Sequence, residues 1–143
     1  MRKVEEITIS SKEKDLESSF SRTALNMFDV VVDTNEIVQN ITKTFFIKAK
    51  NTNELLYLFL KKLYDSANSD LFIPASVKNI KIDMVGRDFF LDAVLSGDMM
   101  RPGYKIKDIV KQVTNRNILI KEDKNGVLTQ INIVVERRKN EGI

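Results

Sequence analysis

Residues 51–74 read N-T-N-E-L-L-Y-L-F-L-K-K-L-Y-D-S-A-N-S-D-L-F-I-P, and this stretch is among the most informative parts of the sequence. Its apolar residues cover most of a helix circumference, which predicts a helix that is buried on more than one side. Asn51 is suited to cap the start of this helix, and Glu54, three residues later, completes a capping-box-like pattern. Pro74 is expected to stop the helix from continuing. The stretch therefore predicts a buried helix with a defined start and end.

An earlier stretch predicts a second helix. Asp15 is suited to cap its start, and apolar residues then recur at three- and four-residue steps up to about Val32. Elsewhere in the chain, apolar and polar residues alternate in the manner of half-buried strands. The expected strands cover residues 4–9, 41–50, 77–85, 89–95, 106–114 and 117–121.

The last hairpin has the clearest local signal. Asn125-Gly126 is the preferred pair at the tip of a type I′ turn, in which both central residues need a positive φ. In the strand that follows, alternate residues are expected to face the core, namely Ile131, Ile133 and Val135. Asn132 and Glu136 are then expected to face away from it.

The order of the expected elements, which is strand, helix, strand, helix and then several strands, predicts an α+β fold. We expect two layers, in which a mixed, mostly antiparallel sheet of about six or seven strands carries both helices on one face. At 143 residues the chain has the length of one domain, 1–143, in which residues 136–143 form a basic C-terminal tail.

The composition limits the chemistry. The chain has neither cysteine nor histidine, which excludes disulfides, thiol nucleophiles and the commonest general base near neutral pH. Any bound metal must therefore use oxygen ligands, which favour calcium, magnesium or manganese. The net charge is +3, and the basic clusters are interspersed with acids in the manner of solvated surfaces.

Catalytic signatures are absent from the sequence. It contains neither a phosphate-binding glycine loop nor a nucleophile elbow, so we expect a protein that is not itself an enzyme. The longest apolar run, Leu55–Leu60, is far shorter than the ~20 residues that span a bilayer, and no signal-peptide pattern follows the first residues. We therefore expect no membrane partner and a cytoplasmic location.

Four segments resemble the archease family in their order and spacing: residues 7–32, residues 51–74, the Gly97-Asp98 turn, and Lys111–Thr114 with the closing hairpin. Archeases are small proteins that activate the GTP-dependent, RtcB-type RNA ligase of tRNA splicing. The resemblance implies an accessory protein that docks near the guanylylation site of the ligase. It would support guanylylation and multiple turnover, while catalysis stays with the ligase.

The resemblance also implies a site. Glu6 stands where the family has a metal-binding acid in the first strand, and Glu136 where it has a second acid at the end of the last strand. Lys111 matches a family lysine near the acid pair and is expected to contact a partner or a phosphate. Both glutamates have the face parity opposite to the apolar set of their strand. If the strands are neighbours, the two carboxylates are expected to hold one divalent ion. The alternative is that both are surface carboxylates at strand ends.

Several positions depart from the family pattern. Lys3, Tyr104 and Arg116 each stand where the family has a histidine, and both acids are Glu rather than Asp. These departures leave a second function open, a metal-free binding module or chaperone-like scaffold for an RNA-modifying enzyme or its RNA. Such a module would use a sheet edge and the basic tail. A third hypothesis, a metal-dependent hydrolase that uses the same acids, has little support in a sequence without histidine or cysteine.

Overall fold

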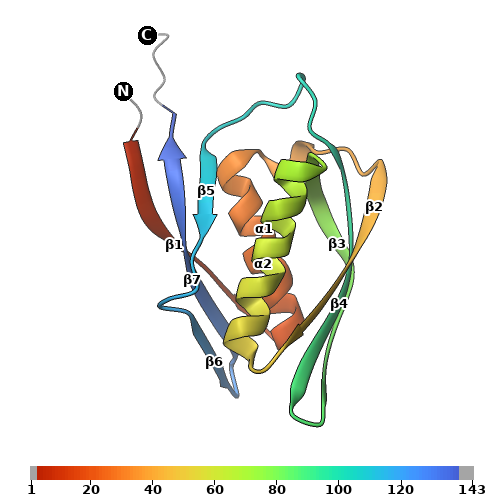
Figure 1. Ribbon diagram of the computed structural model, residues 1–143, viewed down its shortest axis with the longest axis vertical. Coiled ribbons are helices and arrows are strands. Elements are labelled where there is room, and N and C mark those ends of the chain that lie inside the picture. Colours follow the sequence, from red (N-terminus) through yellow and green to blue (C-terminus); the bar gives the residue numbers. More distant parts are fainter. Residues whose placement is uncertain (1–2, 139–143) are drawn as a thin grey trace.

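The computed structural model describes residues 3–138. This part of the chain forms two α-helices, a short 3-10 helix and seven β-strands in two sheets (Figure 1). The four-stranded sheet contains β1 (Lys3–Glu13), β5 (Ile109–Val113), β6 (Leu119–Asp123) and β7 (Gly126–Arg137). The three-stranded sheet contains β2 (Ile41–Ala49), β3 (Phe72–Val85) and β4 (Asp88–Met99). The helices are α1 (Leu16–Val31), α2 (Thr52–Ser69) and the 3-10 helix Thr34–Glu36.

The α+β class is confirmed, as are two helices and about seven strands. All strand pairs are antiparallel. The strands divide between two sheets instead of forming one, and the helices lie between these sheets (Figure 1). Alternating patterns of single strands cannot reveal this division, because each strand has a buried and an exposed face in either arrangement.

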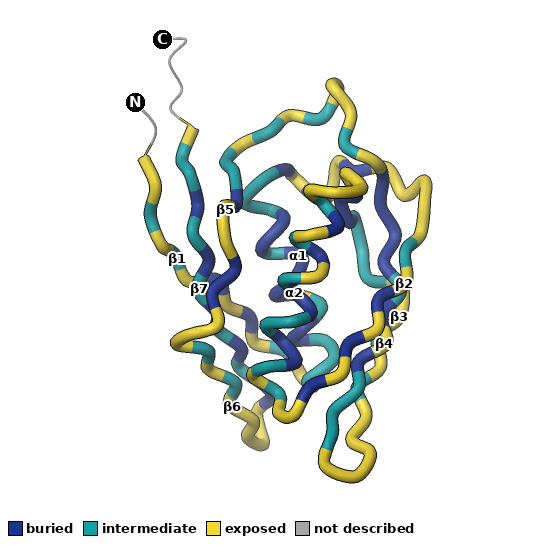
Figure 2. Tube along the Cα trace, in the orientation of Figure 1, coloured by how far each residue is buried: buried dark blue, intermediate teal, exposed yellow. Residues whose placement is uncertain are grey.

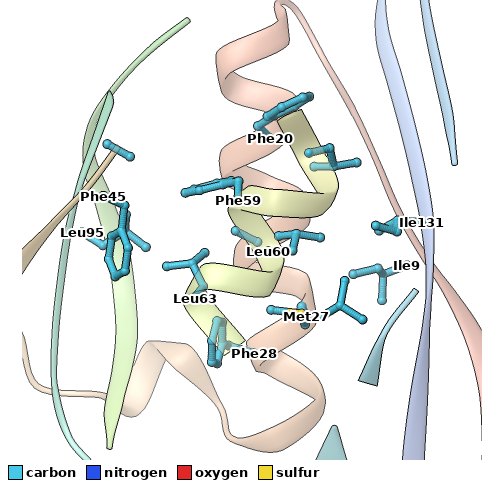
Figure 3. Packing of buried hydrophobic residues seen from close by; sticks show 14 of the residues in the cluster. Ile9, Phe20, Met27, Phe28, Phe45, Phe59, Leu60, Leu63, Leu95 and Ile131 are labelled. Atoms are coloured by element: carbon cyan, nitrogen blue, oxygen red, sulfur yellow. The ribbon is translucent and has the colours of Figure 1, made fainter. Parts of the chain in front are cut away.

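Helix α2 is the centre of the core. Five of its apolar side chains are fully buried: Leu55, Leu56, Phe59, Leu60 and Leu63. Leu58 and Tyr64, which belong to the same predicted apolar set, are only partly buried. In Figure 3, Phe59, Leu60 and Leu63 lie between Phe45 and Leu95 of the three-stranded sheet and Ile9 and Ile131 of the four-stranded sheet. The helix therefore joins the two sheets through one continuous apolar core.

Both helices begin at the predicted caps. The side chain of Asp15 accepts a hydrogen bond from the backbone N–H of Ser18 at 2.8 Å, and that of Asn51 accepts one from Glu54 at 2.8 Å. The Glu54 carboxylate in turn accepts a hydrogen bond from the backbone N–H of Lys50 at 3.2 Å. These contacts satisfy N–H groups that the first helical turn leaves without an intrahelical partner.

Strand β3 begins earlier than predicted. Helix α2 ends at Ser69, and Pro74 lies inside β3 rather than ending the helix. A proline is tolerated there because β3 is an edge strand of the order β2-β4-β3. Pro74 pairs with Gly97 of β4, where a Cβ would lie 2.0 Å from the carbonyl oxygen of Ile73. Glycine is therefore required at this crossing.

Strand β5 begins later than predicted, because residues 106–108 bind the end of α1 instead of continuing the ladder. The backbone N–H of Lys107 donates to the carbonyl of Val31 at 2.7 Å, and that of Asp108 donates to Val30 at 3.2 Å. These hydrogen bonds fix the segment that leads into β5 against the C-terminus of the helix.

The β6–β7 hairpin lies where it was predicted, but its turn is not of type I′. Asp123 pairs with Gly126, so Lys124 and Asn125 form the tip, and neither of them has a positive φ. Gly126 has a φ of 132°, and a Cβ there would lie 2.4 Å from the carbonyl oxygen of Glu13. The glycine therefore serves the close approach of β7 to β1.

The first and last strands pair along their whole length, from Lys3 opposite Arg137 to Glu13 opposite Val127. Burial alternates along β7 (Figure 2). Its inner residues are buried against the helices, as predicted: Ile131, Ile133 and Val135. The outer face of β1 and β7, which is turned away from the helices, carries the acids that the sequence singled out.

Candidate functional site

Glu6 and Glu136 lie on the outer face of two neighbouring strands. Glu6 is opposite Val134, and Glu136 is opposite Val4, so the two glutamates are diagonal neighbours on one face. Diagonal neighbours lie about 7–8 Å apart in an antiparallel pair, within reach of long side chains. The two strands are thus adjacent, and they bring the two predicted acids to the same surface.

Glu6 has strong partners of its own. The Nη2 of Arg116 donates to Oε1 of Glu6 at 2.6 Å, and the Nδ2 of Asn132 donates to Oε2 at 2.8 Å. Arg116 comes from the loop between β5 and β6, 110 residues along the chain. Each oxygen of the carboxylate therefore accepts a hydrogen bond, and the one from the guanidinium is charge-assisted at both ends.

Asn132 connects this face to the loop that carries Arg116. Its Oδ1 accepts a hydrogen bond from the hydroxyl of Thr8 at 2.6 Å. Its backbone carbonyl accepts two from Thr114, one from the N–H at 3.2 Å and one from the hydroxyl at 2.8 Å. Thr114 is buried, so these two hydrogen bonds are shielded from water. The start of the loop is therefore held against β7, on which Asn132 also binds Glu6.

These contacts set the charge of Glu6. The hydrogen bond from Asn132, together with the hydrogen bond and positive charge of Arg116, holds the pKa of the Glu6 carboxyl below its usual value, against the opposing effect of burial. Glu6 is therefore ionised at neutral pH and is balanced by an arginine of the same chain.

Lys111 lies on the other side of β7, in β5. It sits at an irregularity of the ladder, between Val110, opposite Val135, and Gln112, opposite Val134. Its backbone carbonyl accepts a hydrogen bond from the Tyr64 hydroxyl at 2.9 Å, and its side chain is exposed. Among residues 3–138, no ion pair joins its ammonium to either glutamate. The cation that contacts Glu6 is Arg116, and the contact of Lys111 with a partner or a phosphate stays a prediction.

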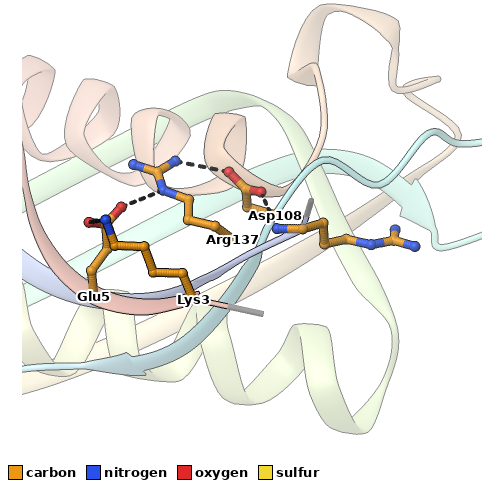
Figure 4. Close-up of polar contacts among 5 residues, drawn as sticks. Lys3, Glu5, Asp108 and Arg137 are labelled. Atoms are coloured by element: carbon orange, nitrogen blue, oxygen red, sulfur yellow. Dashed lines mark hydrogen bonds and ion pairs between the residues drawn. The ribbon is translucent and has the colours of Figure 1, made fainter. Parts of the chain in front are cut away.

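A second ionic cluster is built on Glu5, which is opposite the buried Val135 and so faces the other side of the sheet from Glu6 (Figure 4). The Nε of Arg137 donates to Oε1 of Glu5 at 2.7 Å, and its Nη1 donates to Oδ2 of Asp108 at 2.9 Å. The backbone N–H of Arg138 donates to Oδ1 of Asp108 at 2.9 Å. Lys3, at a position where a family histidine was expected, lies 3.7 Å from Oε2 of Glu5. The cluster joins the ends of β1 and β7 to the segment before β5.

The same contacts shorten the expected basic tail. Glu136 and Arg137 are the last residues of β7, so the tail does not begin at residue 136. Arg137 is neutralised by two carboxylates, and the guanidinium of Arg138 donates to the carbonyl of Ile106 at 3.3 Å. The remainder of the predicted tail, residues 139–143, lies outside the described residues.

Gly97 and Asp98, which were expected in a turn, lie near the end of strand β4. Asp98 forms a third carboxylate site, and this one is buried. The Asp98 side chain is 2% exposed. It accepts hydrogen bonds from the Tyr104 hydroxyl at 2.6 Å, the backbone N–H of Met99 at 2.9 Å and the guanidinium of Arg101 at 2.9 Å. Led by the hydrogen bond from Tyr104, these contacts lower the pKa of Asp98. Tyr104, another residue at a family histidine position, therefore has a structural partner.

The donor set on the outer face does not fit a resident divalent ion. Calcium takes about 6–8 oxygen ligands, of which two glutamates supply only a part. Both oxygens of Glu6 already accept hydrogen bonds, and the Arg116 guanidinium lies at the position where a cation would bind Oε1. Within residues 3–138, no group of three or more acidic side chains is arranged to hold a metal. A divalent ion stays a prediction, and the function proposed below does not require one.

Sequence reasoning did not assign Arg116 and Asn132 to the site. Arg116 was seen only as a departure from a family histidine, and Asn132 only as a residue that faces away from the core. The available signal was the face parity of Asn132, which places it beside Glu6 once β1 and β7 are paired. The loop that carries Arg116 has no periodic pattern, so its contact with Glu6 depends on the tertiary fold.

The comparisons with known proteins define the class. The model of the Archease protein family (MTH1598/TM1083) matches residues 6–135. The chain therefore belongs to the archease family. It is 31% identical to the protein archease of Methanothermobacter thermautotrophicus over 100 residues, which cover 70% of this chain and 71% of the relative. It is 25% identical to the protein archease of Thermococcus kodakarensis over 112 residues, or 78% of each chain.

A solved structure has the same fold. The solution structure of Methanobacterium thermoautotrophicum protein 1598 superposes with a TM-score of 0.73 at 25% sequence identity. The match covers 94% of this chain and 97% of that one. Among the described residues, neither helix is long and apolar enough to cross a membrane.

Proposed function

We propose that this protein is an accessory factor that promotes tRNA splicing by activating an RNA ligase of the RtcB type. It supports guanylylation of the ligase and its return to further rounds of ligation. The protein is not itself an enzyme, and the bond-forming chemistry stays in the ligase. One observation carries the proposal: the archease family model matches residues 6–135, nearly all of the described chain.

The outer face of β1 and β7 is the surface that we assign to this function. It holds Glu6, Arg116 and Asn132 in fixed mutual positions through hydrogen bonds of 2.6 and 2.8 Å. A preset array of charges costs little entropy to order when a partner binds. The described contacts thus support a role in which this face positions a partner's charged groups, such as nucleotide phosphates.

Ligase turnover tests the proposal. A ligase of this type is mixed with a large molar excess of RNA ends, with and without the protein, and ligated product per ligase is counted. In parallel, the rate at which labelled guanylate is transferred from GTP to the ligase is measured. We expect the protein to raise product above one per ligase and to speed labelling. Absence of both effects would contradict the function.

The assignment of the surface needs a separate variant. Glu6→Gln with Glu136→Gln removes two carboxylates from the outer face and keeps their size. The matched control, Asp83→Asn with Asp92→Asn, removes two exposed carboxylates from β3 and β4 in the other sheet. We expect stimulation to fall in the first variant and to persist in the control. Equal stimulation by both would place the working surface elsewhere.

The second candidate function is the metal-free binding module. The Glu6–Arg116 contact favours it, because that contact gives the acid a partner without a metal ion. The basic residues that it would use are engaged, however, since Arg137 is bound by Glu5 and Asp108. Direct RNA binding with a steep dependence on salt, in the absence of any ligase, would favour this function over the first.

A further inference from the structure

We propose that Arg116 takes the place of a divalent cation beside Glu6. The positive charge that neutralises this acidic face then comes from an arginine side chain of the protein, not from a bound metal ion. The functional importance of this inference rests on the proposed function, because Arg116 lies on the face assigned to ligase activation. Its test uses the purified protein alone, so the two can fail separately.

Geometry is the first argument. Nη2 of Arg116 lies 2.6 Å from Oε1 of Glu6, a short contact between oppositely charged groups. The other oxygen accepts from Asn132 at 2.8 Å. A divalent ion on Glu6 would have to displace the guanidinium and tolerate a second positive charge within a few ångströms, which Coulomb repulsion opposes.

The backbone around Arg116 is the second argument. Thr114 binds the backbone carbonyl of Asn132 twice, which fixes the start of the loop. Asn117, directly after the arginine, has a φ of 60°, a left-handed conformation that asparagine accepts more readily than most residues. The arginine therefore lies between two positions with defined local conformation, and its contact with Glu6 is part of the fold.

The chemistry of the side chain is the third argument. A guanidinium keeps its charge at all physiological pH values and has five N–H donors. One of these donors, on Nη2, contacts Glu6, and the Arg116 side chain is 60% exposed. The remaining donors are available to an anionic group of a partner, which is the role that a bound metal ion would otherwise play on a carboxylate surface.

Ion binding by matched variants tests the inference. Melting temperature and calorimetric titration are measured with calcium, manganese and magnesium chlorides, against sodium chloride at equal ionic strength. We expect the wild type to show no ion-specific shift. Arg116→Ala should gain calcium or manganese binding at least about tenfold tighter than the wild type, because removal of the guanidinium frees the carboxylate. A chelator should reverse the shift.

Four further variants complete the experiment. Arg116→Lys keeps the charge and should remain without an ion-specific shift. Arg87→Ala removes an exposed arginine from the β3–β4 turn and should behave as the wild type. Glu6→Gln combined with Arg116→Ala should lose the gained binding. Arg116→Gln repeats the main measurement if the alanine variant does not fold.

Two outcomes overturn the inference. The first is tight, Glu6-dependent binding of a divalent ion by the wild type, which would mean that Arg116 does not stand in for the ion. The second is a folded Arg116→Ala or Arg116→Gln protein that gains no ion binding, since the face would then have no cation position for the arginine to fill. Loss of ligase stimulation alone would count against the proposed function, not against this inference.

Discussion

Two carboxylate sites of this chain use similar partners in different surroundings. Asp98, at the end of β4, accepts from an arginine, a tyrosine hydroxyl and a backbone N–H, and its side chain is 2% exposed. Glu6, on the outer face of β1, accepts from an arginine and an asparagine, and its side chain is 31% exposed. Both lie within residues 6–135, which match the archease family model.

The difference in burial separates their roles. A buried carboxylate that loses its partners leaves unsatisfied groups out of reach of water, which is costly. An exposed ion pair contributes little to stability, because water and salt replace its contacts. We therefore expect the Asp98 site to hold the fold together and the Glu6 site to serve the proposed function.

Asp98→Ala should have the largest effect. The substitution removes the common acceptor of the Tyr104 hydroxyl, the Arg101 guanidinium and the N–H of Met99. We expect the melting temperature to fall by roughly 5–10 °C. Asp92→Ala, on an exposed position of the same strand, is the control and should change it little. A similar fall in both variants would show that burial does not distinguish them.

Tyr104→Phe should have a smaller effect. The hydroxyl donates to Asp98 at 2.6 Å and accepts from the backbone N–H of Val38 at 3.1 Å, so its loss leaves both groups without that partner. We expect a fall in melting temperature of roughly 2–5 °C, measured by circular dichroism or calorimetry. An unchanged value would mean that water replaces the hydroxyl at no cost.

The Asp98 site should also make stability depend on acid. Its partners lower the pKa of Asp98 below the ordinary value of 3.8 for an aspartate, so the ionised form is favoured in the folded state. The stability that results is complete above that unfolded value and is lost as the pH falls through the lower folded value. Urea unfolding from pH 7 to pH 3 should show a constant gap between wild type and Asp98→Asn at neutral pH, which narrows below about pH 4. A gap that widens on acidification would contradict the assignment.

Local sequence signals predicted the helices well, because the information lies within a few residues. The caps at Asp15 and Asn51 bind N–H groups three residues ahead, so the pattern and the contact coincide. The hairpin was located by the same kind of signal. The conformation of its turn was not predicted, because the glycine at position 126 is required by the close approach of Glu13, which lies in a strand distant in the sequence.

The candidate site was only half predictable. Alternation along β1 and β7 placed Glu6 and Glu136 away from the core, and the register of the two strands then brings them to one face. The cation that binds Glu6 was not predicted. Lys111 matched a family pattern, whereas the contact to Glu6 comes from Arg116, which lies 110 residues away in an irregular loop. Contacts of this kind follow from the fold and leave no periodic trace in the sequence.

Glu6→Gln should have the smallest effect on stability and, under the proposed function, a clear effect on activity. Its side chain and that of Arg116 are 31% and 60% exposed, so water solvates both when the ion pair is lost. We expect the melting temperature to stay within about 2 °C of the wild type. Ligase stimulation should fall, whereas Asp98→Ala should keep its stimulation at a temperature where it is folded. The contrary outcome is that Glu6→Gln unfolds the protein but retains its stimulation per folded molecule. The Glu6 site would then stabilise the fold and would not serve activation. Side-chain exposure would in that case not distinguish a stabilising contact from one that is available to a partner.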